Sequence, residues 1–206
     1  MSSEYPKIET LYERDEKTFK VKSGVFKNRT YTLLKEWQWS EKIDGTNIRC
    51  IWQDGKLTFG GKTDNAQIHA DLIKWLYENV SAIKLAEVFP DAPAILYGEG
   101  YGAGIQKGGV YSPTKKFIMF DVLVGGRWWL SWENTCDVAA KLSLDVVPYL
   151  GTMTLEQATE MVRIGFASKL GSATPAEGIV GRPAETLFDK KGHRLIVKLK
   201  TKDFER

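Results

Sequence analysis

The sequence predicts an α+β fold in which helices flank antiparallel sheets, within a single domain over residues 1–206. Short strand-like runs separated by Asp-Gly and Gly-Gly turns occur along most of the chain, and segments of helical period are inserted between them. A chain of 206 residues suits one large domain or two small ones, and it can bury roughly 70% of its unfolded surface without disulfides. There is no internal repeat.

The composition excludes several classes of protein. Cys50 and Cys136 lie far apart without metal-ligand spacing, which favours buried thiols in a reducing compartment. His69 and His193 are too few for a typical zinc site or histidine triad. Residues 1–20 alternate charges and lack the apolar run of a signal peptide or membrane span, so we expect a cytoplasmic protein without membrane contact. A net charge of +3 permits a polyanionic partner without requiring one.

The elements of the first half follow from local pattern. We expect a short strand or hairpin within residues 5–25, a strand at 31–39, and a strand pair, 47–52 and 56–59, joined by the turn Asp54-Gly55. The glycine-bearing stretch 60–65 is either a phosphate-binding edge with Lys62 or an ordinary loop in which Asp64 or Asn65 caps the next helix. One or two helices are expected over residues 66–89, because apolar residues recur there at helical spacing.

The second half is predicted in the same way. We expect strands at 94–97, 117–124, 146–149, 177–182 and 194–200, a helix at 135–142, and a second helix opened by the capping box Thr154-x-x-Gln157. In the last strand, Lys198 and Lys200 share one face while Val197 and Leu199 share the other.

The most specific stretch is Glu41-Lys42-Ile43-Asp44-Gly45-Thr46-Asn47. Read alone, its Asp-Gly pair indicates a hairpin turn. A lysine can also act as a nucleophile, but only after it loses a proton, which neighbouring cations or desolvation favour. The choice between these interpretations depends on partners elsewhere in the chain.

Such partners occur on separate predicted strands. Glu99 and Glu177 adjoin glycines, and Lys198 and Lys200 form a pair of cations near the end of the chain. Together with Lys42 they could bind a nucleoside triphosphate, with the two lysines contacting phosphates and lowering the pKa of Lys42. The implied chemistry is attack of the Lys42 amine on the α-phosphorus of ATP, which releases pyrophosphate and leaves a lysine-AMP phosphoramidate.

The order of these residues along the chain resembles that of a known family. Five stretches resemble, in order, the collinear motifs of covalent nucleotidyltransferases: Glu41 to Asn47, Tyr97 to Gly100, Phe117 to Asp121, Glu177 to Val180 and Val197 to Lys200. Residues 5–8, 62–68 and 100–107 look like the small stand-alone RNA ligases of phages and bacteria. The resemblance covers nearly the whole chain and implies the fold of a ligase adenylation domain, related in kind to ATP-grasp proteins.

The resemblance implies a role for each matching position. Lys42 is the adenylylated nucleophile, Glu41 helps read the adenine, and Phe120 stacks on the base. Asp44 and Asn47 organise the sugar and phosphate side, and Glu99 contacts the ribose. Glu177 positions a metal, and Lys198 and Lys200 contact phosphates. Because both faces of its strand are apolar, Phe117 is the alternative to Phe120.

Other positions depart from the family pattern or are less specific. Lys62 stands where the family commonly has arginine, and a lysine cannot make the same bidentate contact with phosphate. Asp44 stands where one branch of RNA ligases usually has histidine. Arg49 lies on the same strand face as Asn47 and either lines the RNA site or lies on a solvated face. Lys107 and Arg182 are further candidates for RNA contact.

The sequence therefore predicts a monomeric ATP-dependent RNA ligase that uses Mg²⁺, with Mn²⁺ as an alternative ion. Its substrates would be ATP, a 5′-phosphate end and a 3′-hydroxyl end of RNA. Only six residues follow Lys200, so we expect no OB-fold after it. The alternatives are a DNA nick sealer, a module that only adenylylates, and an inactive module that binds nucleic acid.

Overall fold

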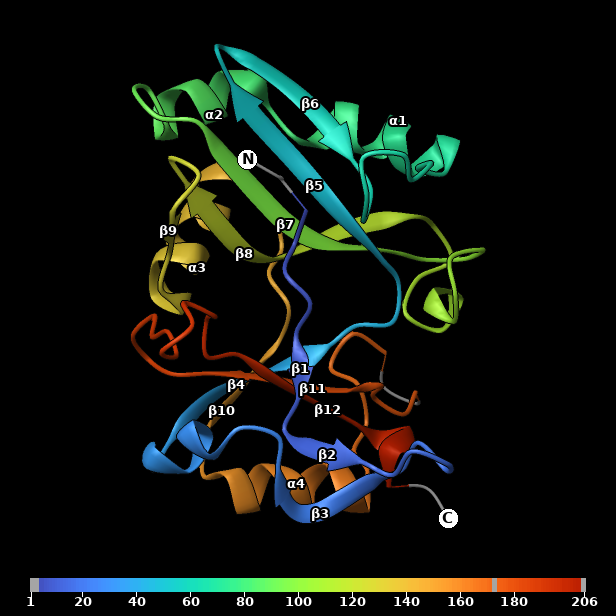
Figure 1. The fold of residues 1–206 in the computed structure, drawn as a ribbon. Coiled ribbons are helices and arrows are strands. Elements are labelled where there is room, and N and C mark those ends of the chain that lie inside the picture. Colours follow the sequence, from blue (N-terminus) through green and yellow to red (C-terminus); the bar gives the residue numbers. More distant parts are fainter. Residues whose placement is uncertain (1–3, 172–173, 205–206) are drawn as a thin grey trace. The chain divides into compact units, whose positions relative to one another are not determined.

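The chain folds into two compact units in a computed structural model that describes residues 4–171 and 174–204. The first unit comprises Met1–Pro6 and Asp44–Val147, and the second comprises Lys7–Ile43 and Pro148–Arg206 (Figure 1). The boundary between the two units falls between Ile43 and Asp44, so it divides the stretch from Glu41 to Asn47. Among the described residues, no helix has the length and apolar character needed to cross a membrane.

The first unit is built on a five-stranded sheet in which all neighbours are antiparallel. Its strands lie in the order β6 (Lys56–Gly60), β5 (Thr46–Gln53), β7 (Ala94–Tyr101), β8 (Lys116–Val124) and β9 (Trp128–Trp129). The β5–β6 hairpin turns at Asp54 and Gly55, whose φ angles of 52° and 71° are those that a two-residue hairpin loop requires. This strand pair confirms the hairpin predicted from the sequence.

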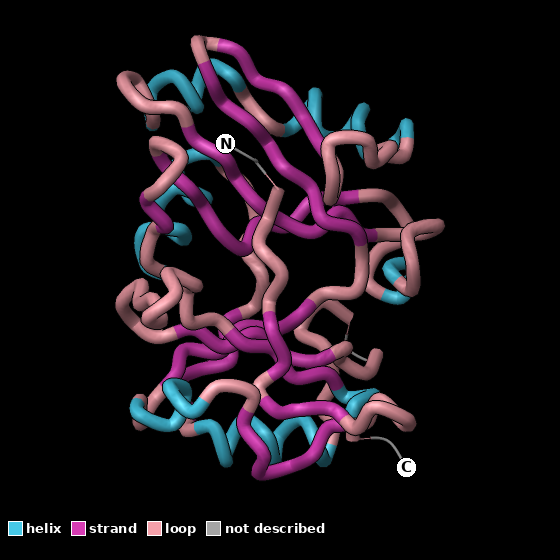
Figure 2. Tube along the Cα trace, in the orientation of Figure 1, coloured by secondary structure: helices cyan, strands magenta, loops and turns pink. Residues whose placement is uncertain are grey.

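Three helices bury one face of this sheet. They are α1 (Ala70–Asn79), α2 (Ala82–Val88) and α3 (Trp132–Leu142), and a short helix, η2, spans Gly108–Val110 (Figure 2). Their buried residues, such as Leu72, Leu85 and Val138, form one core with Ile48 and Cys50 of β5. Strand residues alternate between faces, so Asn47 and Arg49 of β5 lie on the face away from this core.

The second unit holds another five-stranded sheet, in the order β1 (Glu9–Thr10), β12 (Val197–Lys200), β11 (Gly178–Arg182), β4 (Trp37–Lys42) and β10 (Tyr149–Met153). The pair β1–β12 is parallel and the others are antiparallel. A hairpin of β2 (Tyr12–Arg14) and β3 (Val21–Phe26) and the helix α4 (Leu155–Ile164) complete the unit, with η1 (Arg29–Leu33) and η3 (Thr201–Asp203). Thr154 and Gln157 form the predicted capping box of α4.

Three local predictions are wrong. The strand expected at 31–39 begins only at Trp37, because the Asn28 side chain accepts a 2.9 Å hydrogen bond from the Thr30 N–H and caps η1 instead. Neither Asp64 nor Asn65 caps α1, which starts later with His69 as its N-cap. Finally, the strand expected at 146–149 is displaced to β10, which pairs with β4.

Candidate active site

Lys42 and Lys200 are brought together by the register of three strands in the second unit. Lys42, at the end of β4, lies opposite Gly178 of β11, and Gly178 lies opposite Lys200 of β12. Strand alternation directs Trp39 and Leu199 into the core, where both are fully buried. The two lysines therefore lie on the other face of the sheet, one on either side of a residue without a side chain.

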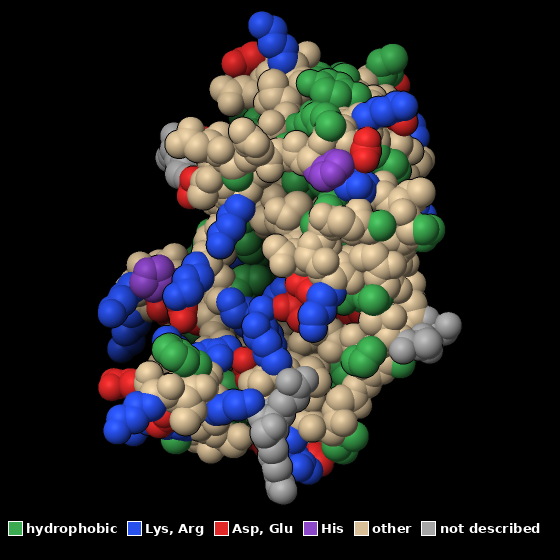
Figure 3. Space-filling view, turned by 90° about the vertical axis from the view of Figure 1, so that its right-hand side faces the viewer, with side chains coloured by type: hydrophobic (Ala, Val, Ile, Leu, Met, Phe, Trp, Pro, Cys, Tyr) green, Lys and Arg blue, Asp and Glu red, His purple; other side chains and the backbone are tan. Residues whose placement is uncertain are grey.

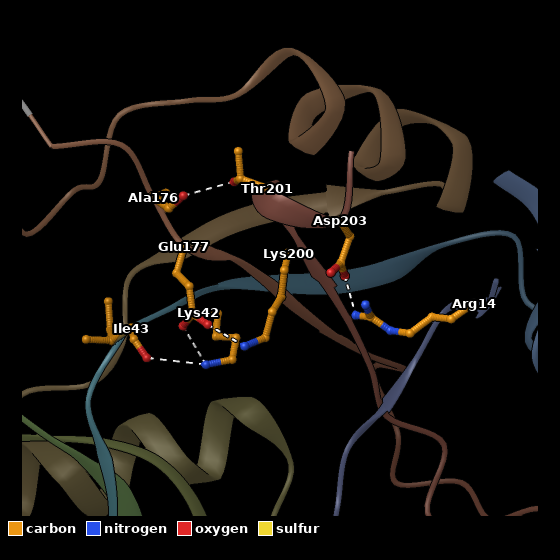
Figure 4. A network of polar contacts seen from close by, with 8 residues as sticks. All are labelled: Arg14, Lys42, Ile43, Ala176, Glu177, Lys200, Thr201 and Asp203. Atoms are coloured by element: carbon orange, nitrogen blue, oxygen red, sulfur yellow. Dashed lines mark hydrogen bonds and ion pairs between the residues drawn. The ribbon is translucent and has the colours of Figure 1, made fainter. Parts of the chain in front are cut away.

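The Glu177 carboxylate joins the two lysines. Its Oε2 accepts a 2.6 Å hydrogen bond from Lys42 Nζ, and its Oε1 accepts one of 2.6 Å from Lys200 Nζ (Figure 4). The three side chains are 15–22% exposed, so these ion pairs are partly shielded from water and stronger than surface pairs. A carboxylate thus links Lys42, of the first sequence motif, to Lys200, of the last.

The backbone around Glu177 is fixed from both sides. A Cβ at Gly178 would lie 2.0 Å from the Leu199 carbonyl oxygen, so β11 and β12 can approach this closely only with glycine there. Thr201 donates its N–H to the Glu177 carbonyl at 2.9 Å and its hydroxyl to the Ala176 carbonyl at 2.9 Å. These contacts hold Glu177 between the two lysines.

Lys198 lies one strand period before Lys200 and is half-buried. Burial lowers the pKa of its ammonium from 10.5 to about 8, and the neighbouring cations Lys200 and Lys42 act in the same direction. Glu9 opposes this shift, whereas Lys7 adds to it. A half-buried lysine that faces other cations is suited to an anionic ligand, since an anion would restore the balance of charge.

Glu41 lies on the opposite side of the sheet from Lys42. It is 1% exposed and stands opposite the buried Ile179. One of its carboxylate oxygens accepts a hydrogen bond from the Ser168 hydroxyl, and the other accepts one of 2.9 Å from the Lys169 N–H. No pattern in the sequence pointed to Ser168 or Lys169. The adenine-reading role of Glu41 stays a prediction, and in this structure its carboxylate anchors another segment of the chain.

In the first unit, the predicted nucleotide residues lie on the sheet face away from the helices. Asn47 stands opposite Glu99 in the antiparallel register of β5 and β7. Among the described atoms, the Asn47 Oδ1 is buried without a hydrogen-bond partner, which is unusual for a buried amide and common at ligand sites. Before β5, Asp44 is half-buried. A Cβ at Gly45 would lie 2.3 Å from the Gly100 carbonyl oxygen, so this turn requires glycine.

The structure distinguishes Phe117 from Phe120. Phe117 is 1% exposed and belongs to the core under the helices, whereas Phe120 lies at a register shift of β8 and is half-buried. Phe120 contacts Tyr5 edge to face, with the ring centroids 5.1 Å apart. The Tyr5 hydroxyl donates a 2.7 Å hydrogen bond to the fully buried Asp121. Tyr5 was not among the predicted site residues.

Arg49 is buried rather than solvated. Only 1% exposed, its guanidinium donates to the Gly61 carbonyl at 2.7 Å and to the Asp64 carboxylate at 2.8 Å. The alternative of a solvated strand face is therefore wrong, and Arg49 holds the loop that carries the exposed Lys62.

The remaining candidates for RNA contact differ in exposure. Lys107 is exposed just before η2, whereas Arg182 is 5% exposed at the end of β11.

The sequence model of the RNA ligase family matches residues 35–200, which include all five motifs. The chain belongs to the RNA ligase family. A comparison with curated proteins gave no significant match. The fold agrees with this family, because the chain is similar to three structures of Naegleria gruberi RNA ligase variants.

The chain resembles these RNA ligases in fold, whereas its sequence identity to them is low. One variant with AMP and Mn has a TM-score of 0.66 and 18% identity, with 82% of this chain and 51% of that chain covered. A variant with ATP and Mn has a TM-score of 0.69 and 16% identity, with 97% and 63% covered. A second variant with ATP and Mn has a TM-score of 0.67 and 16% identity, with 99% and 62% covered. The chain thus spans about half to three fifths of the length of the RNA ligase it matches.

The chemistry of this family member's site is that of an anion-binding surface. Among the described residues, no three His, Cys, Asp or Glu side chains come together as in a metal site made by the protein alone. Glu177 is instead one carboxylate among three lysines. Mg²⁺ is commonly held by one or two carboxylates together with substrate phosphates, which fits such a donor set. Figure 3 shows Lys and Arg side chains gathered beside Asp and Glu side chains on one face.

Proposed function

We propose that this member of the RNA ligase family is an ATP-dependent RNA ligase in which Lys42 carries the adenylyl group. The observation that supports it best is the shared contact of Lys42 and Lys200 with Glu177. This contact places the proposed nucleophile, Lys42, beside Lys200, the proposed phosphate ligand, on one sheet, although their motifs are far apart in the sequence. The similar Naegleria structures contain ATP or AMP together with Mn, which supports an adenine nucleotide and a divalent metal ion as ligands here.

Three group transfers make up the reaction. Lys42 must first leave the Glu177 carboxylate and lose a proton, after which its nitrogen attacks the α-phosphorus of ATP. The P–N bond forms as the P–O bond to pyrophosphate breaks. A 5′-phosphate oxygen of RNA then attacks the same phosphorus, which frees the Lys42 amine and gives an RNA-adenylate. Finally a 3′-hydroxyl attacks the 5′-phosphorus, loses its proton and expels AMP.

The other residues would orient substrates. Lys198 and Lys200 would neutralise phosphate oxygens, and Glu99, Asp44 and Asn47 would hold the ribose and phosphate side. Phe120 would stack on the adenine, Lys62 would contact a phosphate, and Glu41 would contribute to adenine selection. The proposal keeps a single nucleotidyltransferase domain over residues 1–206, because the family match includes residues of both units.

Glu177 is the residue that would hold Mg²⁺ or Mn²⁺, together with phosphate oxygens of the bound nucleotide. When bound, such an ion supplies positive charge that stabilises the oxygens of a transferring phosphoryl group.

Incubation with α-labelled ATP and Mg²⁺, followed by denaturing electrophoresis, tests the covalent step. We expect wild type to acquire an acid-labile label and Lys42→Met to acquire none, while Lys202→Met, which replaces an exposed lysine, keeps it. An unlabelled wild type, or a labelled Lys42→Met, would refute the mechanism.

A second assay tests the substrate and the alternatives. Nicked duplexes with ribose or deoxyribose at the 3′ side of the nick distinguish RNA from DNA joining. Label without joining of either substrate would indicate a module that only adenylylates. RNA binding without label would indicate an inactive binding module.

A further inference from the structure

The segment between β11 and β12 forms a second basic feature of the second unit. We call residues 187–195 the basic hairpin. Leu195 donates its N–H to the Leu187 carbonyl at 2.8 Å, and Phe188 pairs with Arg194 in an antiparallel bridge. The tip turns at Gly192, with a φ of 78°. This segment lies between two strands of the active-site sheet but belongs to none of the five motifs.

The tip of the basic hairpin is ordered by Asp189. Its carboxylate accepts hydrogen bonds from the backbone N–H of Lys191 at 2.8 Å and of His193 at 2.9 Å. The backbone hydrogen bond from His193 lowers the pKa of Asp189, and the one from Lys191 acts in the same direction. The Asp189 carboxylate therefore forms hydrogen bonds within the turn, and these hold the backbone that carries the exposed lysines.

The outward side chains of the tip are positive and aromatic. Lys190 and Lys191 are exposed, Phe188 is 50% exposed on the arm beside them, and the ring of the exposed His193 lies 3.3 Å from the Asp189 carboxylate. An exposed aromatic ring next to lysines is costly to keep in water but suits single-stranded nucleic acid, in which bases stack on rings and lysines contact phosphates.

The basic hairpin continues the line of cations that begins at the active site. From Lys200 and Lys198 on β12, the chain passes back through Arg194 to Lys191 and Lys190. At about 3.3 Å per residue of extended chain, the path from Lys200 to Lys191 spans up to about 30 Å. In a stacked, helical strand a phosphate recurs about every 3.4 Å along the axis, so about nine stacked nucleotides, or fewer in a more extended strand, would cover this path.

We propose that the basic hairpin binds the phosphate backbone of the RNA strand being joined, several nucleotides away from the reacting end. Lys190 and Lys191 contact phosphates, and Phe188 offers a surface on which a base can stack. This inference rests on the proposed ligase function. A long RNA strand would reach these lysines and a short one would not. Transfer of AMP to Lys42 does not involve the basic hairpin and should be unaffected by substitutions there.

The test compares wild type with the double variant Lys190→Ala/Lys191→Ala in binding 5′-phosphorylated RNA, measured by fluorescence anisotropy. Each phosphate contact to a single strand contributes about 0.7 to the slope of log affinity against log salt, so the variant's slope should be shallower by about 1.4. Between about 50 and 200 mM salt, the affinity advantage of wild type over the variant should fall about sevenfold.

RNA length separates this role from a general loss of fold. An oligonucleotide of about three nucleotides spans about 10 Å at this rise, which is too short to reach the tip from Lys42, so both proteins should bind it equally. Only a longer strand, of about 24 nucleotides, should distinguish them. Lys17→Ala/Lys35→Ala, which removes two exposed lysines elsewhere in the second unit, is the matched control and should behave as wild type.

Several outcomes would overturn the proposal: an unchanged salt slope, equal losses for short and long RNA, an equal loss in the control pair, or a wild type that binds both lengths alike. Labelling with α-labelled ATP is measured in parallel. A wild type that takes no label refutes the ligase function, whereas a labelled variant with an unchanged salt slope refutes only the role of the hairpin.

Discussion

Replacing Lys198 by methionine should stabilise the protein at neutral pH while impairing its reaction with ATP. Methionine keeps much of the lysine stem's volume and removes the ammonium that faces Lys42 and Lys200. A pKa lowered from 10.5 to about 8 means that the folded state disfavours the protonated form of Lys198. At 1.36 kcal/mol per pKa unit this cost is about 3 kcal/mol, and solvent screening of a half-buried group reduces it to the order of 1 kcal/mol.

The pH dependence of this gain has a definite sign. Below pH 8, both folded and unfolded wild type carry the Lys198 proton, so the folded state bears the full cost. As the pH rises from about 8 towards 10.5, the folded state releases the proton first, and wild type gains stability relative to the variant. The advantage of Lys198→Met should therefore be largest at pH 7 and disappear near pH 10.5.

Urea unfolding of both proteins at pH 7 and pH 10 measures the effect. A gain of about 1 kcal/mol raises the midpoint by about 0.3–1 M urea for typical slopes. Lys202→Met, at an exposed position nearby, should show no such pH-dependent difference. A Lys198→Met variant that is less stable than wild type at pH 7, or whose gain does not change with pH, would refute the reasoning.

Three further substitutions test neighbouring contacts. Glu177→Gln should reduce labelling of Lys42 by α-labelled ATP about 100-fold or more, because an amide neither balances the lysines nor holds a cation. Gly178→Ala should lower the free energy of unfolding by about 1–3 kcal/mol, since its Cβ would collide with the Leu199 carbonyl; urea unfolding measures it. Arg49→Met should destabilise the protein by about 1–2 kcal/mol in the same assay, because it leaves the Gly61 carbonyl without its donor.

Each of these has a control. Glu185→Gln replaces an exposed carboxylate and should keep labelling, so equal losses would show that Glu177 has no special role. A Cβ at Gly109 would come no nearer than 3.3 Å to the atoms around it, so Gly109→Ala should change the free energy of unfolding by only about 0.5 kcal/mol. Lys56→Met, at the exposed first residue of β6, should leave stability unchanged. A harmless Arg49→Met would show that the guanidinium does not stabilise the loop.

Elements with strong local signals could be predicted from the sequence. The Asp54-Gly55 turn, the helical spacing of residues 66–89 and the capping box at Thr154 each depend on a few neighbouring residues, and all three are observed. The strand expected at 31–39 failed because an Asn28 cap competes with an aromatic strand pattern. The division into two units depends on contacts between distant segments, for which the local pattern contains no signal.

In the candidate site, too, some features could be predicted from the sequence and others depend on contacts that the sequence does not show. The order of the motifs predicted that Lys42, Lys198 and Lys200 meet, and strand register brings them together with Glu177. Alternation along β12 supplied the shared face of Lys198 and Lys200. It could not choose between Phe117 and Phe120, because that choice depends on which face of β8 the helices cover.

Alternation also changes the interpretation of Glu41. Adjacent residues of a strand point to opposite faces, so the carboxylate beside Lys42 lies on the core side of the sheet. There it holds Ser168, whose N–H bonds to the Thr174 carbonyl at 2.7 Å within the segment that leads to Glu177. Glu41 is thus linked to both residues of the ion pair: to Lys42 by a peptide bond and to Glu177 through this segment. A substitution at Glu41 should therefore alter the placement of Glu177 as well as any selection of adenine.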